Sequence, residues 1–397
     1  MAVIGPEWFF SVPCSRFSGV GSGGAVTYPA PGSVNINVPS VLAFVGLRAF
    51  DGTTGAADAA FGFTNPDVIY LRAKITFNAI AGTATQVQLI NINLGSTSNG
   101  LSNGGIEMDC ASGSAVVRAR GSTSSDSVTV TNGQTLEVYL EYRVGQTGVD
   151  SFVMFNNDGI MRPFNAAGTS TTMGSLILAA GITSIGNSPN GTCDITFSDV
   201  ALSHNWFDRG AVEYKLPTGA GNYSGWNDAG GTGTTFAEVD EEPPDDDTTY
   251  VRAGTGLSLV STFDMATYTS SDSGGSVHDP GCVIGVMKGR SETAASGMGM
   301  RLRSGTTDVD RYGGSTLTSW STDYRAYRGQ AQRVDPADGA DWTDTKVNAV
   351  EVGPLKSTTT VRYRCTQVML LIWTCWAADP TGIAARAHAH YQNQGVV

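Results

Sequence analysis

The segment FAEVDEEPPDDDTTY, residues 236–250, divides the chain into two unlike halves. It carries seven carboxylates, which are Glu238, Asp240, Glu241, Glu242, Asp245, Asp246 and Asp247. Two adjacent prolines lie among them. Like charges at this density repel one another, and paired prolines favour polyproline II and remove two backbone donors. With the Gly-rich run 219–233 before it, the segment is predicted to form a solvated connector between two domains at residues 208–247.

The composition predicts an all-β protein. The chain has 397 residues, of which 50 are glycine, and only 15% are charged. Glycine weakens helices and supplies the positive φ angles that hairpin turns need, and this length exceeds one ordinary core. We therefore expect two antiparallel β-sandwiches of the jelly-roll kind, joined by the acidic, proline-containing linker.

The order of strands and turns gives the domain boundaries. Residues 68–77 (VIYLRAKITF) alternate, with Leu71, Ala73, Ile75 and Phe77 on one face, and further short strands follow between Gly, Asn and Asp turns. The expected parts are an N-terminal arm (1–32), a first sandwich (33–207), the linker (208–247), a second sandwich (248–376) and a C-terminal tail (377–397).

Charge and hydropathy exclude two classes of partner. The formal net charge is −12 and Lys and Arg are not clustered, so a nucleic-acid partner is not expected. The longest apolar run, residues 368–376, is far shorter than the roughly 20 residues that span a bilayer. Residues 1–14 lack the basic region of a signal peptide, so synthesis in the cytoplasm without export is expected.

The six cysteines show no metal-type spacing, and no cofactor is indicated. They are Cys14, Cys110, Cys193, Cys282, Cys365 and Cys375. Their even number is compatible with disulfides. Three of them lie in or beside apolar runs, where a reduced thiol behaves as a small hydrophobe, and this reading is preferred.

The N-terminal arm contains three consecutive large apolar residues, Trp8, Phe9 and Phe10. Such a cluster in an arm without regular periodicity is expected to dock on a neighbouring surface. It is predicted to be a subunit interface in a homo-oligomer. The alternative is that the arm closes one end of its own first sandwich.

Few residues suggest chemistry. Trp226 lies in a Gly/Asn/Asp run and could stack on a sugar ring, so it is the candidate glycan contact. His388 and His390 are interpreted as part of a surface tail. Asp335, Asp338, Asp341 and Asp344 lack the spacing of an EF-hand loop and are interpreted as a turn leading into Trp342. No catalytic residue and no metal site are predicted.

One motif resembles a catalytic pattern. Glu238-Val-Asp-Glu-Glu242 has the E-x-D-x-E spacing of laminarinase-like glycoside hydrolases, which place a nucleophile and an acid on one face of a strand. In that family the intervening residues are apolar and the strand continues. Here the fourth residue is Glu241 and two prolines follow at once, so a solvated connector is preferred.

The first half resembles the laminin-G or concanavalin-like sandwich over residues 40–204. The resemblance rests on the succession ITFNAI, IEMDCASGSAVVRAR, LEVYLEYRV, SFVMFNNDG and CDITFSDVALS. It implies the fold and says almost nothing about function.

The second half resembles a module of structural proteins from tailed bacteriophages over residues 225–376. The matching segments, in order, are VDEEPPDDDTTYV (239–251), VIGVMKGR (283–290), RLRSG (301–305), VDPADGADWTDTKVNAVEVG (334–353) and VRYRCTQVMLLIW (361–373). The resemblance implies a non-enzymatic structural protein of the virion that self-assembles as a homo-oligomer with other virion proteins. The alternatives are a host-attachment module that binds a surface glycan and a glycoside hydrolase using Glu238 and Glu242.

Overall fold

The computed structural model describes two compact units. The residues described are 8–9, 19–21, 24–27, 29, 33–38, 45–51, 68–94, 104–143, 150–156, 158, 160–165, 173–181, 190–203, 207, 210–228, 235–242, 244–253, 259–270, 278–293, 297–312, 324–356 and 361–376. The first unit runs to Trp206 and the second begins at Phe207. Both are antiparallel β-sandwiches, so the all-β prediction is confirmed.

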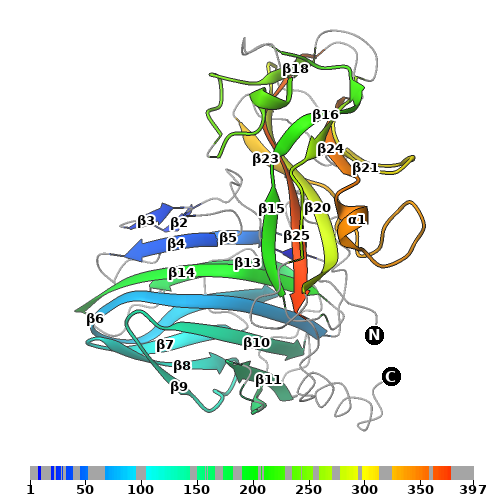
Figure 1. The fold of residues 1–397 in the computed structure, drawn as a ribbon. Helices are drawn as coiled ribbons and strands as arrows, with labels where there is room; N and C mark the ends of the chain where they lie inside the picture. The colour runs from blue at the N-terminus through cyan, green and yellow to red at the C-terminus, as the bar shows by residue number, and fades with distance from the viewer. Residues whose placement is uncertain are drawn as a thin grey trace. The chain divides into compact units, whose positions relative to one another are not determined.

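The first sandwich has two sheets that share one long strand, β6 (Val68–Leu94). Sheet I contains, in spatial order, β12 (Arg162–Asn165), β11 (Asp150–Phe155), β10 (Thr135–Arg143), the first part of β6, β14 (Asn190–Ser203), β4 (Ser33–Val38) and β3 (Ala25–Thr27). Sheet II contains β2 (Gly19–Gly21), β5 (Val45–Asp51), β13 (Met173–Gly181), the second part of β6, β7 (Gly105–Ala111), β8 (Ser114–Arg120) and β9 (Val128–Thr131). Figure 1 shows β6 running the length of this sandwich.

The core of the first sandwich follows from the alternation in β6. Leu71, Ala73, Ile75 and Phe77 are fully buried, as the sequence predicts. They pack in one cluster with residues from sheet II such as Ile106. Because alternate strand residues face opposite sides, the period of two in the sequence fixes which side of β6 becomes the core.

The backbone of the N-terminal aromatic cluster is paired within its own chain. β1 (Trp8–Phe9) runs antiparallel to β14, with Trp8 opposite Leu202 and Phe9 opposite Ala201. The arm therefore contacts its own first sandwich, which is the molecule that the alternative prediction names as its docking surface. The subunit interface stays a prediction, and Phe10 lies outside the described residues.

The second sandwich also has two sheets. Sheet III contains β17 (Asn227–Asp228), β18 (Val251–Ala253), β25 (Tyr363–Trp376), β20 (His278–Ser291) and β23 (Arg325–Arg328), and β15 (Gly210–Lys215) pairs with the far half of β25. Sheet IV contains β16 (Pro217–Ser224), β19 (Ser261–Met265), β24 (Val350–Lys356), β21 (Met298–Ser304) and β22 (Thr307–Tyr312). The described residues of this unit also form the 3₁₀ helix η2 (Thr235–Glu238) and the short helix α1 (Asp344–Val347), the latter capped by the Thr343 side chain.

Glycine allows sheets III and IV to approach closely at the centre of this unit. A Cβ atom on Gly285 of β20 would lie 2.6 Å from Cγ1 of Val352 and 2.9 Å from Sδ of Met300, both on sheet IV. Real Cβ contacts are not this short, so any side chain here would force the sheets apart. Trp342 and Trp373 are buried in this unit.

The linker predicted at 208–247 is wrong, because these residues build the second sandwich. β15 pairs with the central strand β25, and β16 is an edge strand of sheet IV. Within the acidic segment, Val239 is fully buried, and its carbonyl accepts a hydrogen bond from the Val368 amide at 2.9 Å. The segment is therefore folded onto sheet III and does not form a solvated connector.

Basic residues of sheet III balance the charge of the acidic segment. Lys288 pairs with Asp246 at 2.6 Å, and Asp247 accepts from Arg290 at 2.8 Å and Arg364 at 2.7 Å. Burial alone would raise the pKa of Asp247, but hydrogen bonds from Tyr324 and Arg364 lower it below the ordinary aspartate value. The repulsion expected from the sequence is thus offset by cations that lie far away along the chain.

Hydrogen exchange tests this docking of the acidic segment. The amides of Val368 and Tyr250 donate to the Val239 carbonyl and to the Glu238 carboxylate. We expect peptides covering 238–250 to be protected to a degree comparable with β20, as measured by mass spectrometry of the folded chain. Exchange at the rate of an unstructured peptide would contradict the docking.

Candidate functional site

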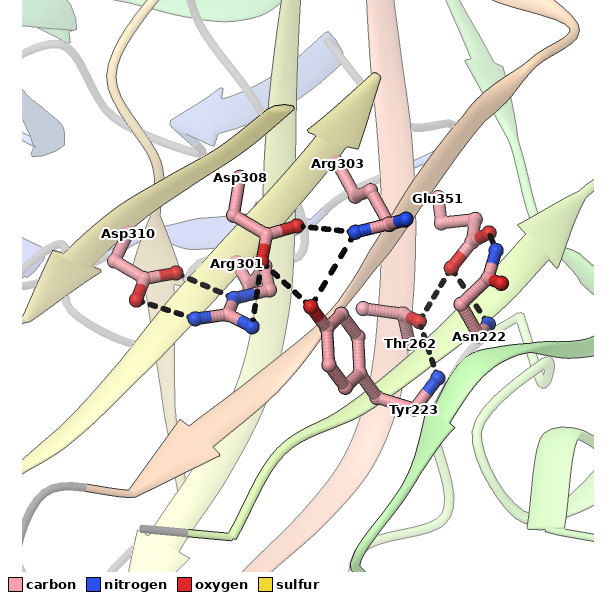
Figure 2. Close-up of polar contacts among 8 residues, drawn as sticks. All are labelled: Asn222, Tyr223, Thr262, Arg301, Arg303, Asp308, Asp310 and Glu351. Atoms are coloured by element: carbon pink, nitrogen blue, oxygen red, sulfur yellow. Dashed lines mark hydrogen bonds and ion pairs between the residues drawn. The ribbon is translucent and has the colours of Figure 1, made fainter. Parts of the chain in front are cut away.

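The outer face of sheet IV carries a network of polar and charged side chains. Its residues come from every strand of the sheet: Asn222 and Tyr223 on β16, Thr262 on β19, Glu351 on β24, Arg301 and Arg303 on β21, and Asp308 and Asp310 on β22 (Figure 2). Because side chains at i and i+2 of a strand share a face, the pairs 301/303 and 308/310 meet across the β21–β22 hairpin.

Glu351 anchors the edge strand β16. Its carboxylate is 6% exposed and accepts hydrogen bonds from the Asn222 backbone amide at 2.8 Å, from the Asn222 side chain, and from the Thr262 hydroxyl at 2.5 Å. The Thr262 oxygen in turn accepts from the Tyr223 amide at 3.2 Å. The buried charge is thereby hydrogen-bonded, as a buried carboxylate requires, and it fixes the position of Tyr223.

Gly221 is required for this anchoring. A Cβ atom at this position would lie 2.5 Å from Oε2 of Glu351 and 2.7 Å from Oγ1 of Thr262. Residues 219–224 of the Gly-rich run, which the sequence assigns to the connector, therefore lie in strand β16. Its glycine lets the backbone approach a buried carboxylate.

Tyr223 is held by two arginines and an aspartate. The guanidinium carbons of Arg301 and Arg303 lie 4.8 Å and 5.3 Å from the centre of its ring. Its hydroxyl donates to Asp308 at 2.7 Å and accepts from Arg303 at 3.3 Å (Figure 2). The hydrogen bond to Asp308 raises the pKa of the Tyr223 hydroxyl above its ordinary value.

The charges of this network are paired. Arg301 forms a bidentate contact with Asp310, in which its Nε and Nη2 atoms each lie 2.6 Å from a carboxylate oxygen. Its Nη1 atom lies 2.9 Å from Asp308. The hydrogen bond to Asp310 raises the pKa of the Arg301 guanidinium. Burial alone would raise the pKa of Asp308, but hydrogen bonds from Tyr223 and Arg303 lower it below the ordinary aspartate value. With these pKa shifts, Arg301, Arg303 and Asp308 are ionised at neutral pH and Tyr223 is neutral.

An open groove of about 500 Å³ lies beside Tyr223. It is lined by Asn222, Tyr223, Ser224, Gly225, Leu259, Val260, Arg301 and Lys356. Lys356 is buried, and this burial lowers the pKa of its amino group. Because Lys356 is fully buried, the groups that the groove offers to a ligand are an aromatic ring, an amide, a hydroxyl and the Arg301 guanidinium, a set that fits a hydroxylated ligand with an acidic group.

Trp226, the predicted glycan contact, is not on this surface. It is 1% exposed, belongs to the core of the second sandwich, and donates its Nε1–H to the Leu259 carbonyl at 3.1 Å. A ring covered on both faces cannot stack on a sugar, so this assignment is wrong. Tyr223, three residues earlier in the same segment, borders the groove instead.

The E-x-D-x-E motif does not form a strand. Glu238 ends η2, is fully buried, and accepts from the Tyr250 amide at 3.2 Å. Glu242 accepts instead from the Gln367 side chain at 3.1 Å. The two carboxylates are thus not presented on one strand face, as the laminarinase-like pattern requires, although Glu238 is not solvated either.

The recurrent aspartates form a turn, as interpreted from the sequence. Asp335 is buried and accepts from the Ser304 hydroxyl at 2.6 Å, and Asp338 pairs with Lys346 at 2.8 Å. Among the described residues, no group of three or more His, Cys, Asp or Glu could hold a metal ion. His388 and His390 lie outside the described residues. The described part of the chain contains no helix long and apolar enough to cross a membrane.

Comparisons with known proteins show a fold likeness alone. No family model and no curated protein match the sequence. Distant structural matches include a mutant Trypanosoma rangeli sialidase displaying trans-sialidase activity (12% identity, TM-score 0.30, 48% of this chain and 28% of that chain). Others are a carbohydrate esterase from Shiga toxin-encoding bacteriophage phi24B (10%, 0.30, 50% and 99%) and the binding domain of botulinum neurotoxin serotype C1 (9%, 0.29, 86% and 95%). The chain spans less than a third of the sialidase, and TM-scores this low relate no residue of the groove to these proteins.

Proposed function

We propose that this chain is a non-enzymatic structural component of a tailed-bacteriophage particle. The supporting observation is that the five segments resembling the phage module bond to one another. Asp246 and Asp247 of the first segment pair with Lys288 and Arg290 of the second, and Asp247 also pairs with Arg364 of the fifth.

The remaining segments interlock in the same way. Ser304, which ends β21 in the third segment, donates to Asp335 of the fourth, and β21 pairs with β24 along its whole length. The polar residues of the module thus hold a sandwich together. Polar residues that bond the segments of the module to one another favour a scaffold, because a particle protein must keep its shape.

The test is the composition of the particle. Phage particles purified from the strain that carries the gene are analysed by quantitative mass spectrometry, and an antibody against the recombinant chain is used for immunogold labelling. We expect the chain in a fixed ratio to the other virion proteins, with labels at one position. Recovery of the chain only in the soluble lysate, with none on particles, would contradict the proposal.

A second function is favoured by the groove beside Tyr223: attachment of the particle to a host surface glycan that carries a carboxylate or sulfate. Tyr223 is fixed by Arg301, Arg303 and Asp308, so the wall of the groove is formed before a ligand arrives. Preformed walls reduce the ordering that binding requires. The lining also includes Arg301, whose guanidinium is the kind of group that recognises a carboxylate or sulfate.

Blocking the groove tests this second function. Ser224 is exposed and lines the groove, so Ser224→Trp fills it without disturbing the core. On an array of acidic and neutral glycans, we expect this variant to lose binding to acidic glycans by about tenfold or more. Ala220→Trp is the matched control, since Ala220 is exposed on the same strand outside the groove. Unchanged binding by Ser224→Trp, or no binding by the native chain, would remove the glycan site while leaving the structural role intact.

A further inference from the structure

Two buried cysteines face each other inside the first sandwich. Cys110 lies on β7 of sheet II and Cys193 on β14 of sheet I, and their sulfur atoms are 4.0 Å apart. Their exposures are 7% and 1%. No disulfide joins the five cysteines that the structure describes. The pair lies between two sheets that share strand β6.

The strand register places the two thiols together. Cys193 is opposite Ile80 on β6, and Cys110 is opposite Ala84, four residues further along the same strand. Between these points β6 passes from sheet I to sheet II, with Gly82 at a φ of 79°. Both cysteines therefore flank one crossover and are held by paired strands.

We propose that Cys110 and Cys193 are a site of oxidative modification, at which a low-molecular-weight disulfide such as oxidised glutathione converts the two thiols into a disulfide linking sheets I and II. A disulfide needs its sulfurs about 2.05 Å apart, so the two side chains must rotate toward each other from their present separation. Neither strand contributes a loop that would have to refold first.

The reaction proceeds by two exchanges. The Cys110 thiolate attacks one sulfur of the small disulfide, forms a mixed disulfide and releases one small thiolate. Cys193 then loses its proton and attacks Cys110 Sγ, which releases the second small thiol. The protein gives up two protons and two electrons, and the small disulfide takes them up to become two thiols.

The local environment makes Cys110 the first nucleophile. The hydrogen bond with Cys193 lowers the pKa of the Cys110 thiol, although burial opposes this, and the same hydrogen bond raises the pKa of the Cys193 thiol. The thiolate is the attacking form, so the lower pKa favours Cys110. Cys110 is also the more exposed of the two.

The cross-link would restrict the unfolded chain. It closes the loop from residue 110 to residue 193, which contains strands β8 to β13. Long closed loops give the largest loss of unfolded-state entropy, so we expect a rise of roughly 5–10 °C in the melting temperature of the first sandwich. In a reducing compartment the pair stays as thiols, and oxidising surroundings close it.

The test uses the full chain, reduced and then incubated with oxidised glutathione under native conditions. We expect intact mass to fall by two hydrogens, and peptide mapping to join Cys110 to Cys193. The melting temperature should rise and return after dithiothreitol.

Cys110→Ala should abolish both changes, whereas Cys365→Ala, in the second sandwich, should keep them. Because the native chain is compared with itself before and after oxidation, the result stands even if a variant folds poorly. A stable glutathione adduct without the internal link, a link between other cysteines, or a link that leaves the melting temperature unchanged would overturn the proposal.

Discussion

Gly221→Ala is expected to lower the free energy of unfolding of the second sandwich by about 2–3 kcal/mol. The added methyl group would lie 2.5 Å from Glu351 Oε2 and 2.7 Å from Thr262 Oγ1. Neither atom can withdraw easily, because Glu351 is buried and bonded to Asn222 and Thr262. The edge strand β16 would have to lift away, which would leave these polar groups without their partners.

Urea unfolding measures this loss, followed by the fluorescence of the tryptophans buried in the second sandwich, Trp226, Trp342 and Trp373. Gly219→Ala is the matched control on the same strand. Its Cβ would make only an ordinary contact, 3.5 Å from Asp264, so we expect a change below about 0.5 kcal/mol. Equal effects of the two substitutions would show that Glu351 does not fix β16. If Gly221→Ala alone lowers the stability, a loss of glycan binding in this variant would follow from displacement of Tyr223.

The strands of the first sandwich could be predicted from the sequence because their signal is local. In β6 the apolar residues alternate with polar ones, and Leu71, Ala73, Ile75 and Phe77 are buried as the period of two requires. Which face of a strand is buried follows from the pattern of residues adjacent in the sequence, so a short segment is enough to predict it.

The acidic segment could not be predicted, because its partners are distant in sequence. Asp247 is separated by 43 residues from Arg290 and by 117 from Arg364. A run of carboxylates considered alone appears self-repelling, and only the folded sheet III supplies the compensating cations. The same limit applies to Gly221, whose neighbour Glu351 is 130 residues away along the chain.

The candidate site was missed for a related reason. Trp226 was chosen because large aromatics often contact sugars, but its ring is in the core. Tyr223 carried a usable signal: it alternates with Gly221 and Gly225 in a strand-like pattern, and Arg301-x-Arg303 and Asp308-x-Asp310 offer complementary charges at the same period. Their meeting required the pairing of β21 with β22 and the position of β16 at the edge of the sheet.

Glu238→Ala is expected to cost the second sandwich about 2–3 kcal/mol, whereas a solvated connector would tolerate it. The Glu238 side chain is fully buried at the end of η2, and its carboxylate accepts from the Tyr250 amide at 3.2 Å. The substitution removes that acceptor and leaves a cavity beside the turn that carries Asp246 and Asp247 to their cations.

Glu242→Ala serves as the control for charge alone. Glu242 is exposed, and Gln367, which donates to it, keeps a second acceptor in the Glu241 carbonyl at 2.6 Å. We expect a change below about 1 kcal/mol, since a mostly exposed contact contributes little. Both variants remove one negative charge from the same acidic segment, so repulsion between carboxylates would affect them alike. A large loss in Glu238→Ala with a small one in Glu242→Ala therefore identifies burial as the cause. Equal, small effects would mean that the segment is a solvated connector after all.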